Sequence, residues 1–254
     1  MNTRLVLTSL ALAAGLAGGA APALAAEQPS VVIVHGAFAD GSDFAKVVPL
    51  LQAKGVKVTV VQNPLESLAG DVATAKRAID NQKGKVVLVG HSWGGQVITQ
   101  AGDSDKVVGL VYVAAFAPSV GEAVGDLGKD LPAPPGIAKL VADSQGWLSL
   151  PPAAMAADFA QDVPAAQAAV MAATQGPINS KAFGEKVTVA AWQGRPSWYI
   201  VSANDHMIQP DLERAMAKKI GATVTTLPTS HVPQQSRPAD VAAVILKAVE
   251  ATTK

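Results

Sequence analysis

The feature that most restricts the fold of this chain is an alternation of short, β-branched runs with segments of helical spacing. Strands are expected at residues 31–34, 56–61, 86–89, 107–115, 197–201 and 223–227. Helices are expected between and after them, at residues 43–54, 67–82, 93–101, 210–220 and 239–251. Strands that are apolar throughout and separated by helices favour a parallel sheet covered by helices on both faces. The predicted fold class is therefore α/β, with a mostly parallel sheet of about six strands.

The alternation stops at Pro118, and the chain is rich in alanine, proline and glycine as far as about Val189. Short helices fit residues 152–160 and 164–173 in this stretch. Its content of Leu, Met, Trp and Phe is too high for a floppy linker, which is the alternative interpretation. We therefore predict a helical cap inserted at about 118–190 into a single domain that covers residues 26–254.

Residues 1–25 have the pattern of a signal peptide. Arg4 supplies a positive start, residues 5–18 are apolar, and Ala23-Leu24-Ala25 gives a small-x-small cleavage pattern. The alternative is a membrane anchor, but the apolar run is short for a bilayer span and lacks a charged stop. We expect cleavage after Ala25, export to the periplasm or medium, and no membrane span in the mature chain.

Composition excludes several classes of function. Lys+Arg and Asp+Glu both number 20, so no basic excess points to a nucleic-acid partner. The chain has no cysteine, which excludes disulfides, a catalytic thiol and a thiolate metal site. Hydrophobic residues make up 49%, so the chain can bury a large core from which its stability must come.

A candidate nucleophile lies in the motif Gly90-His91-Ser92-Trp93-Gly94, directly after the third predicted strand and at the start of a predicted helix. A serine at such a tight strand-to-helix turn has a strained backbone and an exposed hydroxyl, and the flanking glycines permit close packing. The start of the helix also adds a positive dipole near a developing oxyanion. We interpret Ser92 as a nucleophile, the alternative being a helix-capping serine in a glycine-rich turn.

A serine hydroxyl needs a base, and the chain has only four histidines. His91 is adjacent to Ser92 and leaves the turn in another direction, while His35 ends the first strand. His206 follows the strand at 197–201 and stays possible. His231 lies between the last strand and the last helix, where a loop can reach over the strand ends. We therefore predict His231 as the general base.

The base in turn needs an acidic partner that holds its tautomer. Asp205 follows the strand at 197–201, and strand-end loops face the ligand side of a parallel sheet. The resulting order of Ser92, Asp205 and His231 along the chain is that of the α/β-hydrolase arrangement. Asp211, in the first turn of a helix, and Glu122, after the fourth strand, are the alternatives.

An acyl-transfer site also needs N–H donors for an oxyanion. The N–H of Trp93 is one candidate, because it follows the nucleophile. The second is expected in the loop His35-Gly36-Ala37-Phe38, from Ala37 or Phe38, with Phe38 favoured by analogy with related loops. The alternative for this loop is a simple glycine turn between strand and helix.

Together these motifs resemble the α/β-hydrolase superfamily over nearly all of the mature chain, from Val31 to the last helix. The resemblance rests on VIVHGAF, FAKVVPLLQAKG, VVLVGHSWGG, SANDHMIQP and SHVPQQSRP. Among the subfamilies, the chain looks most like small esterases related to plant methylesterases and hydroxynitrile lyases. The lyases typically carry a threonine in place of Gly36 and a lysine in place of Val232, and both departures favour ester hydrolysis.

The resemblance implies a serine hydrolase that cleaves a small carboxylic ester through an acyl-enzyme, without a metal ion or an organic cofactor. A cofactor-free haloperoxidase or perhydrolase with the same triad is one alternative. A non-catalytic homologue that keeps only the ligand pocket is the other.

An apolar pocket beneath the cap would favour an uncharged, fairly hydrophobic substrate. The residues expected to bind it are Phe38 and Trp93 beside the nucleophile and Trp147 and Phe159 from the cap. Further cap candidates are Leu148, Met155, Met171 and Phe183.

Overall fold

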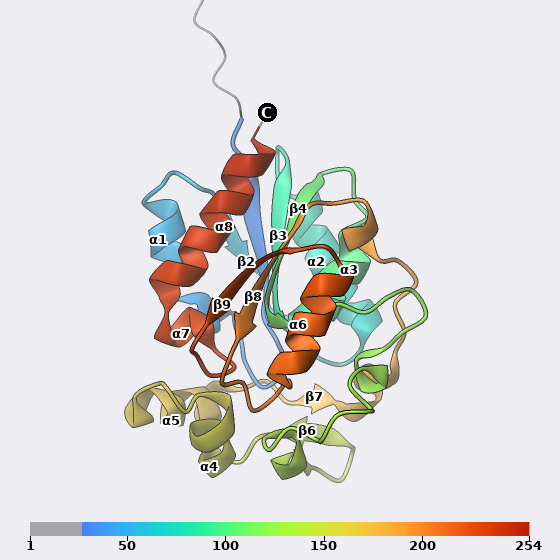
Figure 1. The fold of residues 1–254 in the computed structure, drawn as a ribbon, viewed down its shortest axis with the longest axis vertical. Helices are drawn as coiled ribbons and strands as arrows, with labels where there is room; N and C mark the ends of the chain where they lie inside the picture. The colour runs from blue at the N-terminus through green and yellow to red at the C-terminus, as the bar shows by residue number, and fades with distance from the viewer. Residues whose placement is uncertain (1–26, 254) are drawn as a thin grey trace, which may run out of the picture.

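The computed structural model describes residues 27–253, so the signal peptide predicted at residues 1–25 lies outside the described part of the chain. The main sheet has six strands in the spatial order β2-β1-β3-β4-β8-β9, all parallel (Figure 1). The strands are β1 (Ser30–Val34), β2 (Val58–Val60), β3 (Val86–Ser92), β4 (Val107–Ala115), β8 (Ser197–Ser202) and β9 (Thr223–Leu227). The predicted α/β fold is confirmed, although β2 is shorter than residues 56–61 and β3 continues to Ser92.

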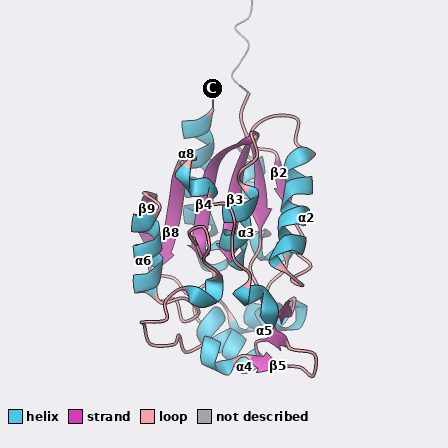
Figure 2. Cartoon of the chain, turned by 90° about the vertical axis from the view of Figure 1, so that its right-hand side faces the viewer, coloured by secondary structure: helices cyan, strands magenta, loops and turns pink. Residues whose placement is uncertain are grey.

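Alternating side chains of each strand pack on opposite faces of the sheet. Val32 and Val34 of β1 belong to a core that also contains residues of α2 (Leu68–Asp80), α3 (Trp93–Ala101) and α6 (Pro210–Lys219). Val31 and Ile33 belong to the opposite core, which includes α1 (Val48–Gln52) and α8 (Pro238–Thr252). In Figure 1 the sheet lies between these two layers, with α1 and α8 on one side and α2, α3 and α6 on the other, and Figure 2 looks onto the face covered by α2, α3 and α6.

The helix expected at residues 43–54 is interrupted. A 3-10 turn at Gly41–Phe44 is followed by the short helix α1, which carries Pro49 in its first turn. Proline has no N–H and fits the first turn of a helix but not its interior, so the helix restarts here instead of continuing.

The segment between β4 and β8 contains helices and a second sheet. Besides short 3-10 helices, it contains α4 (Pro152–Ala154), a π-helix at Met155–Phe159, and α5 (Ala165–Thr174). The three antiparallel strands are β5 (Val141–Ala142), β6 (Trp147–Ser149) and β7 (Ile178–Asn179). In Figure 1, α4, α5, β6 and β7 gather beyond the ends toward which the main strands point. Strands of two or three residues are too short to produce a recognisable alternation, which is why the sequence did not predict them.

Candidate active site

Ser92 is the last residue of β3 and the N-cap of α3, and its backbone is in the left-handed region, with φ 52° and ψ −120°. A Cβ on Gly90 would lie 2.5 Å from the carbonyl oxygen of Gly94, and one on Gly94 would lie 2.3 Å from that of Val34. Only glycine fits at these two positions, so they allow the strand and helix to pack around the turn. This is the strained strand-to-helix turn that the five-residue motif predicts.

Gly36, in the loop that follows the neighbouring strand β1, lies directly against this turn. A Cβ added to Gly36 would lie 2.8 Å from Ser92 Cβ and 3.1 Å from both the Nδ1 and the carbonyl oxygen of His91. Nothing larger than glycine fits without displacing the serine. The loop after β1 and the turn after β3 therefore form one tightly packed unit.

The loops after β8 and β9 bring Asp205 and His231 together. The Nδ1 of His231 lies 2.5 Å from the Oδ2 of Asp205, and both side chains are buried. The other oxygen of Asp205, Oδ1, accepts from the N–H groups of Met207 at 2.6 Å and Ile208 at 3.0 Å. The carboxylate is thus held by its own loop and aimed at the imidazole.

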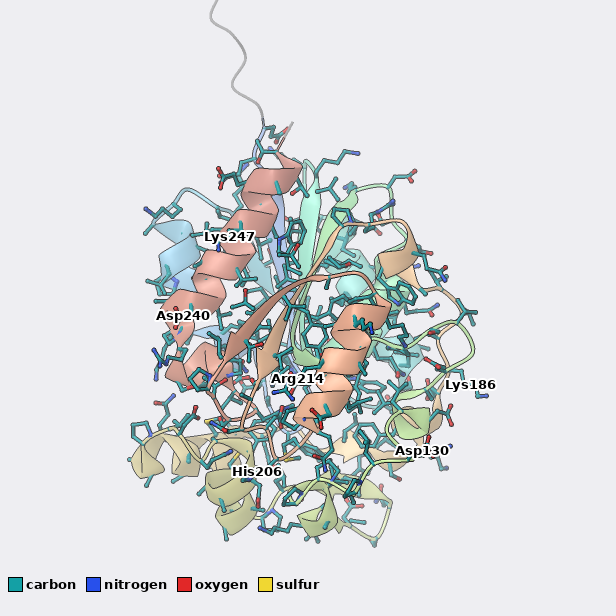
Figure 3. The ribbon with its side chains drawn as sticks, in the orientation of Figure 1. Asp130, Lys186, His206, Arg214, Asp240 and Lys247 are labelled. Atoms are coloured by element: carbon teal, nitrogen blue, oxygen red, sulfur yellow. The ribbon has the colours of Figure 1, made fainter. Side chains whose placement is uncertain are left out.

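The acids and base kept as alternatives lie elsewhere. Asp211 pairs with Arg214 at 2.7 Å on the surface, and Glu122 pairs with Lys219 at 3.2 Å. The half-exposed His206 lies toward the cap, 3.5 Å from a carboxylate oxygen of Asp158 (Figure 3). Of the three candidate acids named from the sequence, only Asp205 contacts His231.

The backbone of His231 is fixed by a buried polar network that the sequence analysis did not identify. His91 Nε2 lies 2.8 Å from the carbonyl oxygen of His231, and His91 Nδ1 lies 3.7 Å from Asp43 Oδ2. The Asp43 carboxylate accepts from the side-chain amides of Gln234 and Gln235. These glutamines lie in the short helix α7 (Pro233–Ser236), just after His231.

The ionisation of this network follows from its burial. Burial, and then the proximity of His231, lowers the pKa of His91 well below its ordinary value, so His91 is neutral and donates its Nε2 proton to the carbonyl. Burial raises the pKa of Asp43, against the opposing effect of the two glutamine amides. Asp43 begins the helix predicted at residues 43–54, where an acidic residue is common, so the local sequence gives no signal for this network.

The two candidate second oxyanion donors differ in their hydrogen bonding. The N–H of Phe38 donates to the carbonyl oxygen of Gly176 at 3.2 Å, so it is already engaged. Within residues 27–253, no oxygen accepts from the N–H of Ala37. Trp93 occupies the first position of α3, where an N–H has no partner within the helix. Of the two candidate second donors, Ala37 is therefore the one whose N–H has no acceptor among the described residues.

Ser92 and His231 open onto one cavity of about 360 Å³. Apart from these two residues and Gln209, its lining consists of apolar side chains and glycines. The amide of Gln209 donates to the carbonyl oxygen of Pro132 at 2.6 Å. Charged side chains are absent from the lining formed by the described residues. The larger apolar side chains of the lining are Phe38, Trp93, Phe116, Leu127, Ile137, Leu140, Leu148, Phe183, Met207, Ile208 and Leu212.

The pocket residues predicted from the sequence fall into two groups. Phe38 and Trp93 line the cavity, whereas Trp147 and Phe159 do not. Trp147 and Leu148 are consecutive in strand β6, so they point to opposite faces, and it is Leu148 that reaches the cavity. Phe159 is fully buried and lies edge-on to the His231 ring at 5.0 Å between centroids. It packs behind the histidine and does not face the cavity.

The remaining cap candidates also divide. Phe183 lines the main cavity and meets the Trp93 ring edge-on at 5.7 Å between centroids. Met155 is buried in the core, and Met171 lines a second, more polar cavity of about 240 Å³.

Trp93 is anchored from behind the cavity by a buried carboxylate. Its Nε1 donates to Asp71 Oδ2 at 2.7 Å, and the N–H of Leu65 donates to Asp71 Oδ1 at 2.9 Å. Burial raises the pKa of Asp71 to about 6, although these two hydrogen bonds act in the opposite direction. This contact fixes the indole that forms one wall of the cavity.

Two general findings concern the described residues as a whole. Residues 27–253 contain no group of three or more His, Asp or Glu side chains that could hold a metal ion. In the same part of the chain, no helix combines the length and the apolar character needed to cross a bilayer.

Comparison with known families gives a match to the alpha/beta hydrolase family over residues 31–244. A pyrethroid hydrolase of Sphingobium wenxiniae is 26% identical over 85% of this chain and 85% of its own length. Methylesterase 2 of Arabidopsis thaliana is 35% identical, over 34% of this chain and 39% of its own.

Solved structures show the same fold. The crystal structure of a pyrethroid hydrolase from Sphingobium faniae superimposes with a TM-score of 0.75 at 21% identity, covering 88% of this chain and 98% of that one. At this level of identity the similarity concerns the fold alone.

Proposed function

The chain belongs to the alpha/beta hydrolase family and is an esterase-like hydrolase, and we propose that it cleaves uncharged carboxylic esters through an acyl-enzyme on Ser92. The observation that carries the proposal is the arrangement around the cavity. Ser92 on its strained turn and His231 share one apolar cavity, and His231 is backed by Asp205 at 2.5 Å. These are the three groups that serine acyl transfer requires.

In the proposed first step, His231 takes the proton of the Ser92 hydroxyl as the oxygen attacks the ester carbonyl carbon. The tetrahedral intermediate collapses when its C–O bond to the alcohol breaks, and His231 returns the proton to the leaving alcohol. In the second step His231 takes a proton from a water molecule as its oxygen attacks the acyl-enzyme. The bond to the Ser92 oxygen then breaks and His231 returns the proton to that oxygen, which releases the acid and free Ser92. Asp205 holds the imidazole and stabilises its charged form throughout.

The N–H groups of Ala37 and Trp93 are the donors that we assign to the oxyanion. Both residues line the cavity beside Ser92. The Phe38 N–H donates to the carbonyl oxygen of Gly176, whereas neither of these two N–H groups donates to a backbone carbonyl of the described chain. Each such donor typically contributes about 10²–10³-fold to kcat in serine hydrolases.

The cavity supports an uncharged, hydrophobic substrate. A charged acyl or alcohol group would lose its hydration without meeting a counter-charge in a lining of apolar side chains. The close contact of Gly36 with Ser92 also supports ester hydrolysis, since the threonine of the hydroxynitrile lyases cannot fit there without displacing the serine.

The test is hydrolysis of p-nitrophenyl esters by the wild-type protein and by Ser92→Ala. We expect hydrolysis of butyrate and longer acyl esters, loss of at least about 10³-fold in kcat in Ser92→Ala, and labelling of the wild type alone by a fluorophosphonate. Equal rates in the two proteins would refute the proposal. Bromination that requires peroxide and acetate would instead indicate the haloperoxidase alternative, and ligand binding without turnover the non-catalytic one.

We further propose that the protein is exported with cleavage after Ala25. The support is the sequence pattern of residues 1–25 alone. N-terminal sequencing of protein recovered outside the cytoplasm should begin at Ala26, and an intact Met1 in that fraction would contradict the cleavage.

A further inference from the structure

Glu213 is a buried acid whose presence the proposed mechanism does not yet explain. It lies in α6, on the side of that helix that carries Met216 and Ala217 into the core, and none of its surface is exposed. Its Oε2 accepts from the N–H of Ser202 at 3.0 Å, whereas its Oε1 is buried and receives no N–H or O–H donor from the described residues. A buried carboxyl oxygen without a donor is costly and calls for an explanation.

The neighbour of Glu213 is the acid that backs the histidine. Both acids are buried at the same turn, because the Ser202 N–H donates to Glu213 at 3.0 Å and the Asp205 N–H donates to the carbonyl oxygen of Ser202 at 3.3 Å. This turn places the two carboxyl groups close enough to interact, in agreement with the effect of Asp205 on the pKa of Glu213. Two ionised carboxylates in contact inside a protein repel each other strongly, so such a pair keeps one proton between its oxygens. The shared proton therefore provides a hydrogen-bond donor at Glu213 Oε1, where no N–H or O–H group of the described residues does so.

The hydrogen-bond donors decide which carboxyl group keeps the proton. Asp205 faces three donors, namely the Met207 and Ile208 N–H groups and His231 Nδ1. Among residues 27–253, Glu213 accepts a hydrogen bond only from the Ser202 N–H. Hydrogen bonds to the charged form stabilise it, so the negative charge stays on Asp205 and the proton on Glu213.

The other ionisable groups near the pair do not alter this assignment. Arg214, the next residue of α6, pairs with Asp211 at the surface (Figure 3). Tyr199, on β8, donates its hydroxyl proton to the carbonyl oxygen of Ala115. Desolvation by burial, followed by the charge of Asp205, raises the pKa of Glu213 well above its ordinary value, in agreement with the donor geometry.

We propose that Glu213 is a positioning residue whose protonated carboxyl group donates a hydrogen bond to Asp205 and so fixes that carboxylate opposite His231. Glu213 then acts through Asp205 on His231, which shares the cavity with Ser92. The inference rests on the proposed function for the role of Asp205, but the protonation of Glu213 stands on its own surroundings.

The test compares Glu213→Gln with Glu213→Met. Glutamine keeps both the acceptor for Ser202 and, through its N–H₂, the donor to Asp205, whereas methionine keeps the length and loses both. We expect Glu213→Gln to retain kcat within about twofold and to leave the acidic limb of the kcat/KM profile in place. Glu213→Met should lose about tenfold or more in kcat with little change in KM, because Asp205 loses one of the hydrogen bonds that fix its orientation toward His231. The surface variant Glu250→Gln is the control.

A direct readout of the proton is the infrared difference spectrum of wild type minus Glu213→Gln at pH 7. We expect a protonated carboxylic acid band, which the spectrum of wild type minus Glu250→Gln should lack. A missing band would overturn the proposal, as would a folded Glu213→Met with wild-type kcat. A shift of the acidic limb to lower pH in Glu213→Gln, by more than about half a unit, would show an ionised Glu213 and would also overturn it.

The two proposals fail in different ways. If Ser92→Ala keeps full activity, the proposed function is wrong, and the infrared band, which needs no turnover, still decides the state of Glu213. If Glu213→Met does not fold, the acidic limb of Glu213→Gln and the infrared band remain decisive.

Discussion

Substituting Gly36 with alanine tests how tightly the nucleophile is packed. The new Cβ would lie 2.8 Å from Ser92 Cβ and 3.1 Å from two atoms of His91. Ordinary carbon–carbon contact begins near 3.4 Å, so the serine must move by about 0.6 Å or the β1 loop must move instead. The Ser92 Cβ and the β1 loop are both fixed by the backbone, and the close contacts of Gly90 and Gly94 hold the turn at Ser92. Neither group can therefore move easily to make room for the new Cβ.

A displacement of 1 Å at a reacting group can cost about 10²-fold in rate, so we expect Gly36→Ala to lose about 10–100-fold in kcat on a p-nitrophenyl ester. Overpacking should also lower the free energy of unfolding by about 1–3 kcal/mol, measured by urea unfolding. Gly194→Ala is the matched control, because its added Cβ would meet no atom within 4 Å in the described part of the chain beyond the adjacent residues, and its φ is −121°. A stable Gly36→Ala with the wild-type kcat would refute the packing argument.

Three further predictions concern the cavity and its supports. Leu148→Ala should raise KM for a bulky aryl ester about tenfold, while Trp147→Ala should leave it unchanged, because only the leucine lines the cavity. In Asp71→Asn, one of two N–H donors loses its acceptor, at a cost of about 1–3 kcal/mol by urea unfolding at pH 7. Asp71 keeps its proton up to about pH 6 when folded and only below about pH 4 when unfolded, so from about pH 4 to 6 wild-type stability should fall relative to that of Asp71→Asn. His91→Leu should lower kcat and stability together, since the carbonyl of His231 loses its buried donor.

The features that could be predicted follow either from the order of elements in one short segment or from the topology of a parallel sheet. Ser92 could be placed because a strand, a glycine turn and a helix follow one another along the chain. The contact between Asp205 and His231 could be predicted because the carboxyl ends of parallel strands meet at one edge of the sheet.

The structural details that could not be predicted from the sequence depend on contacts between distant segments. Nothing near Phe38 in the sequence indicates that its N–H is taken by Gly176, because that bond forms only when the cap folds back on the β1 loop. Likewise, Trp147 and Leu148 exchange roles with a one-residue change of register, which a three-residue strand cannot specify. Asp43 reaches His91 and Gln234 through the tertiary fold alone.

The left-handed backbone of Ser92 has a consequence for how the protein gains its reactivity. A non-glycine residue at φ 52° costs about 1–3 kcal/mol and persists only where its surroundings impose it. Those surroundings come from the β1 loop, from α3 and from the end of β4, so no isolated fragment of the chain can hold the serine in this state. Recovery of fluorophosphonate labelling during refolding should therefore coincide with the final cooperative step. The reactivity of Ser92 then reports when the fold is complete.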